Sequence, residues 1–379
     1  MKYNNIGIIL LTALTLVVCS CSSDDLNGES IFKDDLKDVG QTTEFDSWLK
    51  KNYLDTYNVK LMYRYVDNES DRSYNVIPAD YDKAKALAIL VKQIWLDAYT
   101  EVMGVDFLKT YSPRIIQLTG SYKYQQNESG ESGGVVMGTA EGGLKVMLYG
   151  VNSMDIDNPY INVDDPYSSD KWSTKKFDLN HWFFHTMHHE FCHILTQKKE
   201  YSTEFRTISA ADYHATDWVN VKDKDAAAEG FVTGYGSGEY NEDFAEIYAM
   251  YVTMKPEAWQ KIIDNSRKKT GEKTKLDANG NVVYKLDANG DKIKKYLKDD
   301  EGKDMYVLNP QTGAYERAFE YETEMEPVYD ETGTEIILKK LNIVKEYFKT
   351  SWNLDIDKLR TVILRRSSEV STLDLRKLN

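Results

Sequence analysis

Three residues in the stretch HHEFCHILTQ, residues 188–197, could together bind a metal ion and move a proton. His189 and His193 lie four positions apart, so on a helix their imidazoles can approach one metal ion at about 2 Å each. Glu190 lies beside them, where its carboxylate can take a proton from a metal-activated water. The spacing predicts a catalytic Zn2+ site with Glu190 as the general base.

The residues around this motif indicate how a helix would present it. With His189 at zero and about 100° per residue, His193 falls near 40° and Glu190 near 100°. The large apolar residues fall on the opposite side: Phe183, Phe184, Met187, Phe191, Ile194 and Leu195. An apolar side packed into the core would leave the side with the two histidines free to bind metal.

A catalytic zinc usually takes three protein ligands and leaves one position for water. The segment GYGSGEYNEDFAEIYAMYV, residues 234–252, offers Glu242 and Glu246, one turn apart on a predicted helix that Asn241 could cap. Either carboxylate could be a zinc ligand or the hydrogen-bond acceptor of a ligand histidine. An ordinary acidic face on a surface helix is the alternative.

Three further residues near the motif are not assigned to the site. His185 lies one turn before His189, but a histidine at a helix end is more often merely exposed. His188 points away from His189. Cys192 has the chemistry of a metal ligand, yet a small buried side chain is the expected role.

The elements that must position these residues predict an α+β fold. The stretch at 58–66, NVKLMYRYV, alternates as a half-buried strand does, and a helix is predicted over 79–104, with Gly104 as its stop. Two more strands are predicted within 113–124 and 144–152. This order favours an antiparallel or mixed sheet with helices packed on one side.

Residues 270–335 differ from the rest of the chain in their sequence pattern. KLDANG occurs at Lys275 and again at Lys285, and similar Asx-rich stretches separate Tyr- and Val-rich segments. Such stretches are typical of hairpin turns, and they lack the ligand order of an EF-hand loop. We predict a β-meander inserted into a catalytic domain that comprises residues 45–269 and 336–379.

The N-terminus has the pattern of a secretory signal. Lys2 precedes the apolar run IGIILLTALTLVV, which is too short to span a membrane as a helix. Residues 1–20 are therefore a predicted signal peptide. The following VCSC, which ends at Cys21, resembles the bacterial lipobox, and this resemblance implies lipidation of Cys21. Residues 21–44 would then be a flexible tether.

The composition of the chain argues against some classes of binding partner. The chain has 379 residues, of which 41% are hydrophobic, enough to build a core. Its net charge of −14 argues against nucleic acid and anionic membrane surfaces as partners. If Cys19 leaves with the signal and Cys21 carries lipid, Cys192 has no disulfide partner.

The pair HEFCH and EDFAE is similar to the gluzincin pattern of zinc metallopeptidases. This resemblance implies a zincin-like domain in which Glu242 is the third zinc ligand and Glu246 supports a ligand histidine. Some gluzincins carry an oxyanion-binding tyrosine where Tyr235 stands; Tyr240 is the alternative. By analogy with zincins, the strand at 144–152 would pair with an extended substrate.

The lipobox, HEFCHILTQ, GFVTGY and EDFAEIYA together resemble the Bacteroidetes zinc metallohydrolase lipoproteins associated with TonB-dependent import. This resemblance implies a metallopeptidase that is lipid-anchored in the outer membrane and faces the cell exterior. A peptide or protein would be its substrate, and a TonB-dependent importer with its lipoproteins would be its partners. SSDD, residues 22–25, resembles the tag for surface display. A zinc hydrolase of other amides or esters, and a non-catalytic binding lipoprotein with structural zinc, are the alternatives.

Overall fold

The computed structural model describes residues 42–64, 76–126, 132–136, 138–141, 144–169 and 176–378. The predicted signal peptide, Cys21 and nearly all of the predicted tether lie outside these residues. Within the part described, no helix is both long enough and apolar enough to cross a membrane. The chain divides into two compact units, of which the first ends at Trp48. Helix α3 (Glu44–Leu49) lies at this boundary.

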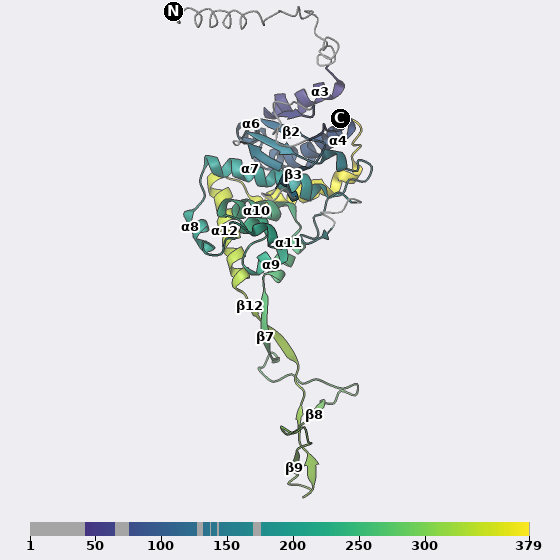
Figure 1. The fold of residues 1–379 in the computed structure, drawn as a ribbon, viewed down its shortest axis with the longest axis vertical. Helices are drawn as coiled ribbons and strands as arrows, with labels where there is room; N and C mark the ends of the chain where they lie inside the picture. Colours follow the sequence, from purple (N-terminus) through teal and green to yellow (C-terminus); the bar gives the residue numbers. More distant parts are fainter. Residues whose placement is uncertain are drawn as a thin grey trace, which may run out of the picture. The chain divides into compact units, whose positions relative to one another are not determined.

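The second unit contains a four-stranded mixed sheet, of which β2 is labelled in Figure 1. The strand order is β1-β2-β6-β5. Strands β1 (Lys60–Met62), β2 (Ile115–Leu118) and β6 (Lys145–Leu148) are parallel, and β5 (Gly138–Glu141) is antiparallel to β6. A separate antiparallel pair consists of β3 (Lys123–Gln126) and β4 (Ser132–Val136). The predicted α+β class is confirmed, with the mixed rather than the antiparallel sheet.

Strand β6 was expected to offer an edge to an extended substrate, and this expectation is wrong. Both of its edges are occupied, because β2 pairs with one side and β5 with the other. All four residues of β6 are buried, as a central strand requires. Among the described strands of this sheet, β5 is the outer one on that side.

The helix predicted over 79–104 is present as three consecutive segments. They are α4 (Tyr81–Val91), the π-helical η3 (Lys92–Leu96) and α5 (Asp97–Met103). Asp80 caps the first turn by accepting hydrogen bonds from the amides of residues 82 and 83. Gly104 ends the helix with φ of 82°, a conformation that favours glycine.

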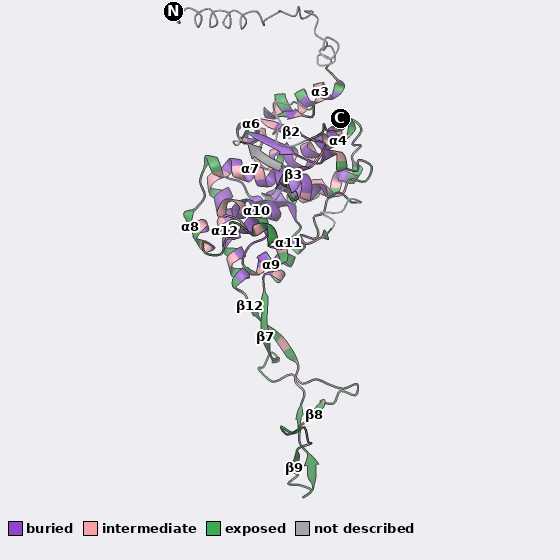
Figure 2. Ribbon diagram, in the orientation of Figure 1, coloured by how far each residue is buried: buried purple, intermediate pink, exposed green. Residues whose placement is uncertain are grey.

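The described residues form further helical segments before, between and after these strands. They are η1 (Lys50–Asp55), α6 (Val105–Tyr111), η4 (Val151–Ser153), η6 (Asn180–Phe184), α7 (His185–Lys198), α8 (Thr203–Ile208), η7 (Trp218–Asn220), α9 (Asp223–Ala228), η8 (Tyr235–Ser237), α10 (Tyr240–Thr253), α11 (Pro256–Asn265), α12 (Thr332–Trp352), α13 (Ile356–Ser368) and η9 (Glu369–Thr372). α10 packs against α7, α12 and α13, and it is buried from Asp243 onward (Figures 1 and 2). The two helices that carry the motifs therefore lie together in the core.

Two residues of α7 that sequence analysis left out of the site belong to this core. His188 is fully buried, and its Nδ1 lies 2.9 Å from the hydroxyl of Tyr99, which also contacts Tyr248. Cys192 is a buried free thiol, as expected, and burial raises its pKa well above the usual value. Both side chains are therefore part of the packed core.

The predicted insertion consists of antiparallel strand pairs. The pairs are β7 (Lys268–Thr274) with β12 (Met325–Asp330), β8 (Lys294–Tyr296) with β11 (Phe319–Tyr321), and β9 (Tyr306–Leu308) with β10 (Tyr315–Arg317). In each KLDANG turn the aspartate accepts hydrogen bonds from amides two and four residues later. The next helix, α12, begins at Thr332, which the sequence analysis placed inside the insertion over 270–335.

The insertion is stabilised by cross-strand pairs, since most of its residues are exposed (Figure 2). One face of the ribbon carries lysine–glutamate pairs, including Lys295 with Glu320 and Lys285 with Glu322. The other face carries neighbouring aromatic rings: Tyr284, Tyr296, Phe319 and Tyr321. Such pairs are the usual source of stability in a sheet that has no buried face.

Candidate metal centre

Helix α7 fixes the two motif histidines through its buried side. Phe191, Ile194 and Leu195 are at most 1% exposed and hold the helix against the core. The opposite edge carries His189 and His193, whose ring centroids are 4.7 Å apart. The segment therefore places both imidazoles as the spacing predicts.

Helix α10 supplies both carboxylates. The helix begins at Tyr240, so Asn241 lies inside it and is not the cap that we expected. The Asn241 side chain instead accepts a hydrogen bond from the Tyr201 hydroxyl. Glu242 lies in the first turn of α10, where the helix dipole favours a negative charge.

Three ligating atoms from the two helices converge. Nε2 of His189 lies 2.9 Å from Oε2 of Glu242 and 3.0 Å from Nε2 of His193. Nε2 of His193 lies 3.3 Å from the same Glu242 oxygen. Two imidazole nitrogens and one carboxylate oxygen at these separations fit the donor set of a catalytic zinc ion.

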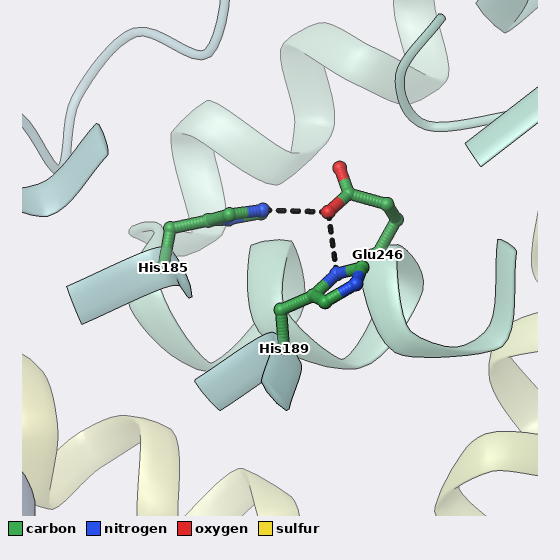
Figure 3. A group of neighbouring side chains, drawn as sticks. All are labelled: His185, His189 and Glu246. Carbon is green, nitrogen blue, oxygen red and sulfur yellow. Dashed lines mark hydrogen bonds and ion pairs between the residues drawn. The ribbon is translucent and has the colours of Figure 1, made fainter. Parts of the chain in front are cut away.

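The second carboxylate, Glu246, contacts His189 from the other side of its ring. The Nδ1 atom of His189 donates to Oε1 of Glu246 at 2.8 Å, and Nε2 of His185 donates to the same oxygen at 2.7 Å (Figure 3). The Thr233 hydroxyl donates to Oε2 at 2.7 Å. Glu246 thus fixes the ring of His189 with Nε2 directed toward Glu242 and His193.

Two partners of Glu246 were not predicted from the sequence. His185 was expected to be exposed, but it is buried because η6 continues the helix toward the N-terminus and moves His185 away from the helix end. Its position one turn before His189 was the signal that could have identified it. Thr233 comes from a loop, where no periodic pattern predicts a contact.

A second group, His185, His189 and Glu246, also has three potential ligand atoms close together. It is the poorer zinc site, because its carboxylate already accepts three hydrogen bonds and its side chains are at most 11% exposed. In the first group the side chains of Glu242 and His193 are 24% and 16% exposed. Only the first group leaves access for water and substrate, which a catalytic zinc needs.

The electrostatics of the first group favour a cation. Burial opposes a positive charge on His189, but its hydrogen bonds with Glu242 and Glu246 outweigh burial and raise its pKa to about 10. Burial likewise opposes ionisation of Glu242, yet hydrogen bonds from both ligand histidines hold its pKa below the usual value. A metal ion would replace the proton on Nε2 of His189, since metals bind the neutral imidazole.

The predicted base and oxyanion donor lie beside these ligands. Glu190 follows His189 directly on α7. The ring of Tyr235 lies 5.7 Å from that of His189, centroid to centroid. Tyr240 packs instead under Arg206, whose guanidinium carbon is 5.0 Å from the ring centre. The structure therefore favours Tyr235 over Tyr240.

The two imidazoles and the carboxylates that the two helices bring together fit the metal-binding site of the zinc metallopeptidase class. The chain belongs to the family described as "Putative zinc-binding metallo-peptidase", whose model matches residues 38–357.

A solved structure described as a "putative zinc-binding metallo-peptidase from Bacteroides caccae" is similar, with a TM-score of 0.57 and 30% sequence identity. The match covers 90% of this chain and 100% of that chain. No curated protein matches. The predicted zinc cofactor agrees with the family and with this structure, both of which are described as zinc-binding.

Proposed function

We propose that this protein is a zinc-dependent peptidase in which His189, His193 and Glu242 hold the metal. The observation that carries the proposal is the convergence of the three ligand atoms within 3.3 Å, next to Glu190 on the same helix. A bound zinc ion supplies a Lewis acid that polarises a carbonyl group and acidifies water.

The protein's own groups perform the proton transfers. Glu190 takes a proton from the attacking water and later delivers it to the leaving amine. Glu246 keeps His189 in the tautomer whose Nε2 lone pair faces the site. Partial burial and the charge of Glu242 raise the pKa of Tyr235, so its phenol stays protonated and can donate a hydrogen bond to the developing oxyanion.

The outer strand of the main sheet is the place where we expect an extended peptide to bind. Strand β5 contacts α7 and lies at the end of the described sheet order. Its outer edge can add a substrate strand through backbone hydrogen bonds, which the central strand β6 cannot do. A peptide is thus a better match to this site than a compact ester or amide.

The direct test compares the zinc-loaded wild type with Glu190→Gln against a broad peptide library, read by mass spectrometry. We expect cleavage by the wild type and a loss of at least about 100-fold in the variant, with the same zinc content and melting temperature. Unchanged cleavage by the variant would remove Glu190 from the mechanism. No cleavage by the zinc-loaded wild type would favour another amide or ester substrate, or a binding role.

Localisation forms a second part of the proposal. The lipobox-like VCSC and the acidic SSDD support a lipoprotein anchored through Cys21 in the outer membrane and facing outward, beside a TonB-dependent importer. Cys21→Ser should release the protein from the membrane fraction. External protease should digest the wild type on intact cells. Membrane retention of the Cys21→Ser variant, or full protection from protease, would contradict these assignments.

A further inference from the structure

The turn that carries Tyr235 is held firmly, although its sequence, GYGSG, has three glycines. Gly236 and Ser237 are buried, whereas Tyr235 is 42% exposed. The Ser237 hydroxyl donates to the carbonyl of Gly234 at 2.6 Å, and the amide of Gly236 donates to Thr233 at 3.0 Å. Tyr235 is thus the side chain that this turn directs outward.

Residues 214–223 precede the turn in the sequence and contact both of its ends, and we call this segment the clamp. At the first end, the Gly234 amide donates to Asp223 at 3.0 Å, and a Cβ atom on Gly234 would lie 2.0 Å from the carbonyl oxygen of Val221. At the second end, the amide of His214 donates to the carbonyl of Ser237 at 2.7 Å. The glycine at position 234 therefore allows close packing and does not indicate flexibility.

Trp218 makes the side-chain part of this clamp. Its ring meets that of Tyr235 edge to face, with centroids 4.9 Å apart and an interplanar angle of 74°. It also packs on the far end of the turn, because a Cβ atom on Gly238 would lie 3.2 Å from its Cδ1 atom. The ring of Tyr235 is therefore bounded by Trp218 and, at 5.7 Å, by His189.

We infer that Trp218 is a positioning residue that holds the Tyr235 hydroxyl where the oxyanion develops. The inference rests on the proposed function, in which Tyr235 is the donor. Trp218 acts through the position of the phenol, since its ring packs against Tyr235 and against the end of the turn at Gly238. Aromatic pairs favour edge-to-face contacts of this kind, so the contact stabilises this orientation of the Tyr235 ring.

The kinetic test is a double-mutant cycle with Trp218→Ala and Tyr235→Phe in the full-length, zinc-loaded protein. Loss of an oxyanion donor lowers kcat by about 100-fold or more, and we expect this for Tyr235→Phe. Trp218→Ala should lower kcat by about 10-fold or more, with little change in KM and none in zinc content. In the Tyr235→Phe background it should have no further effect.

Two other variants sharpen the cycle. Trp218→Phe keeps an aromatic edge against Tyr235 and should restore most of the activity. Val219→Ala changes the next residue, which is 61% exposed, and should leave kcat unchanged. The inference would be overturned if the losses in kcat from Trp218→Ala and Tyr235→Phe multiplied in the double variant. It would also be overturned if Trp218→Ala and Val219→Ala lowered kcat equally.

A second readout does not depend on activity. In the protein stripped of metal, amide hydrogen exchange at residues 235–238 should be faster in Trp218→Ala than in Val219→Ala. Equal exchange in both variants would show that Trp218 does not hold the turn and would overturn the inference. If the wild type cleaves no peptide while this difference in exchange is present, the proposed function is wrong, but Trp218 still holds the turn.

Discussion

His189 joins the two carboxylates of α10 through its two ring nitrogens. Its Nε2 faces Glu242 at 2.9 Å, and its Nδ1 faces Glu246 at 2.8 Å. A carboxylate behind a ligand histidine orients the ring and raises its basicity toward a metal. The two glutamates therefore have different roles, although they lie on the same helix one turn apart.

The two roles predict different zinc contents for the two alanine variants. Glu242→Ala removes a ligand and should leave the purified protein largely free of zinc. Glu246→Ala removes only the support and should weaken zinc binding by about 10- to 100-fold while retaining one site. Metal analysis with competitive chelation measures both. Zinc retained by Glu242→Ala but lost from Glu246→Ala would reverse the assignment.

His185 should affect zinc affinity without being a ligand. His185→Ala removes one of the three hydrogen bonds to Glu246, so we expect zinc affinity to fall by roughly 10-fold, with about 1:1 stoichiometry kept. His214→Ala is the matched control, since its Nε2 contacts Glu229 at 2.8 Å on the exposed surface. Equal affinities for the two variants would mean that His185 does not support the site.

At the scale of residues, the predicted and observed positions agree where they depend only on the spacing of residues along one helix. The pairs at 189 and 193 and at 242 and 246 follow from one helical turn. His185 had the same spacing, but its burial depends on η6 extending the helix, and that extension is set by the packing of residues 180–184. No spacing rule could predict the contact of Thr233 with Glu246, because it joins a loop to a helix.

At the scale of elements, a buried ion pair ties α12 to the start of α10. Nζ of Lys340 lies 2.7 Å from Asp243, next to Glu242, and both side chains are 0% exposed. Lys340 also donates to the carbonyl of Gly230 at 2.9 Å. Tyr213 donates to the same Asp243 oxygen at 2.9 Å. The pair thus holds together the helix with Glu242 and the loop that leads to Thr233.

Breaking this pair should destabilise the fold. Lys340→Met leaves a buried carboxylate without its partner, and we expect the free energy of unfolding to fall by about 3–5 kcal/mol. Lys339→Met is the control, because Lys339 pairs with Glu204 on the surface and such pairs contribute about 1 kcal/mol or less. Urea denaturation measures both changes. Losses of similar size would mean that burial of the pair has no special importance.

Element order was predictable, but the partners of each strand were not. The alternation at 58–66 and the apolar run at 144–152 identified strands, because side-chain periodicity is local. The place of β6 between β2 and β5 depends on contacts between distant segments. The start of α12 was missed for a similar reason, since Gly333 packs against the backbone of residues 227, 228 and 266.

At the scale of the whole molecule, the β-ribbon of residues 268–330 leaves and re-enters the rest of the structure at one place. Lys268 and Asp330 are cross-strand partners, and Lys269 pairs with Tyr329. Just outside them, Arg267 and Glu331 form an ion pair at 2.5 Å. Because the two ends are already adjacent, a short turn could close the gap.

Replacing residues 270–328 by Asn-Gly should leave the rest of the protein folded. We expect one cooperative thermal transition within a few degrees of the wild type and an unchanged zinc content, because the deleted residues are mostly exposed. Hydrolysis of short peptides should also persist. An unfolded product, or one without zinc, would show that the insertion is needed to build the site.

The central claim concerns where the metal binds, and crystals of the zinc-loaded protein measured at the zinc absorption edge test it most directly. We predict one anomalous peak at about 2.0–2.2 Å from Nε2 of His189, Nε2 of His193 and a carboxylate oxygen of Glu242. A peak among His185, Nδ1 of His189 and Glu246, with none beside His193, would contradict the account.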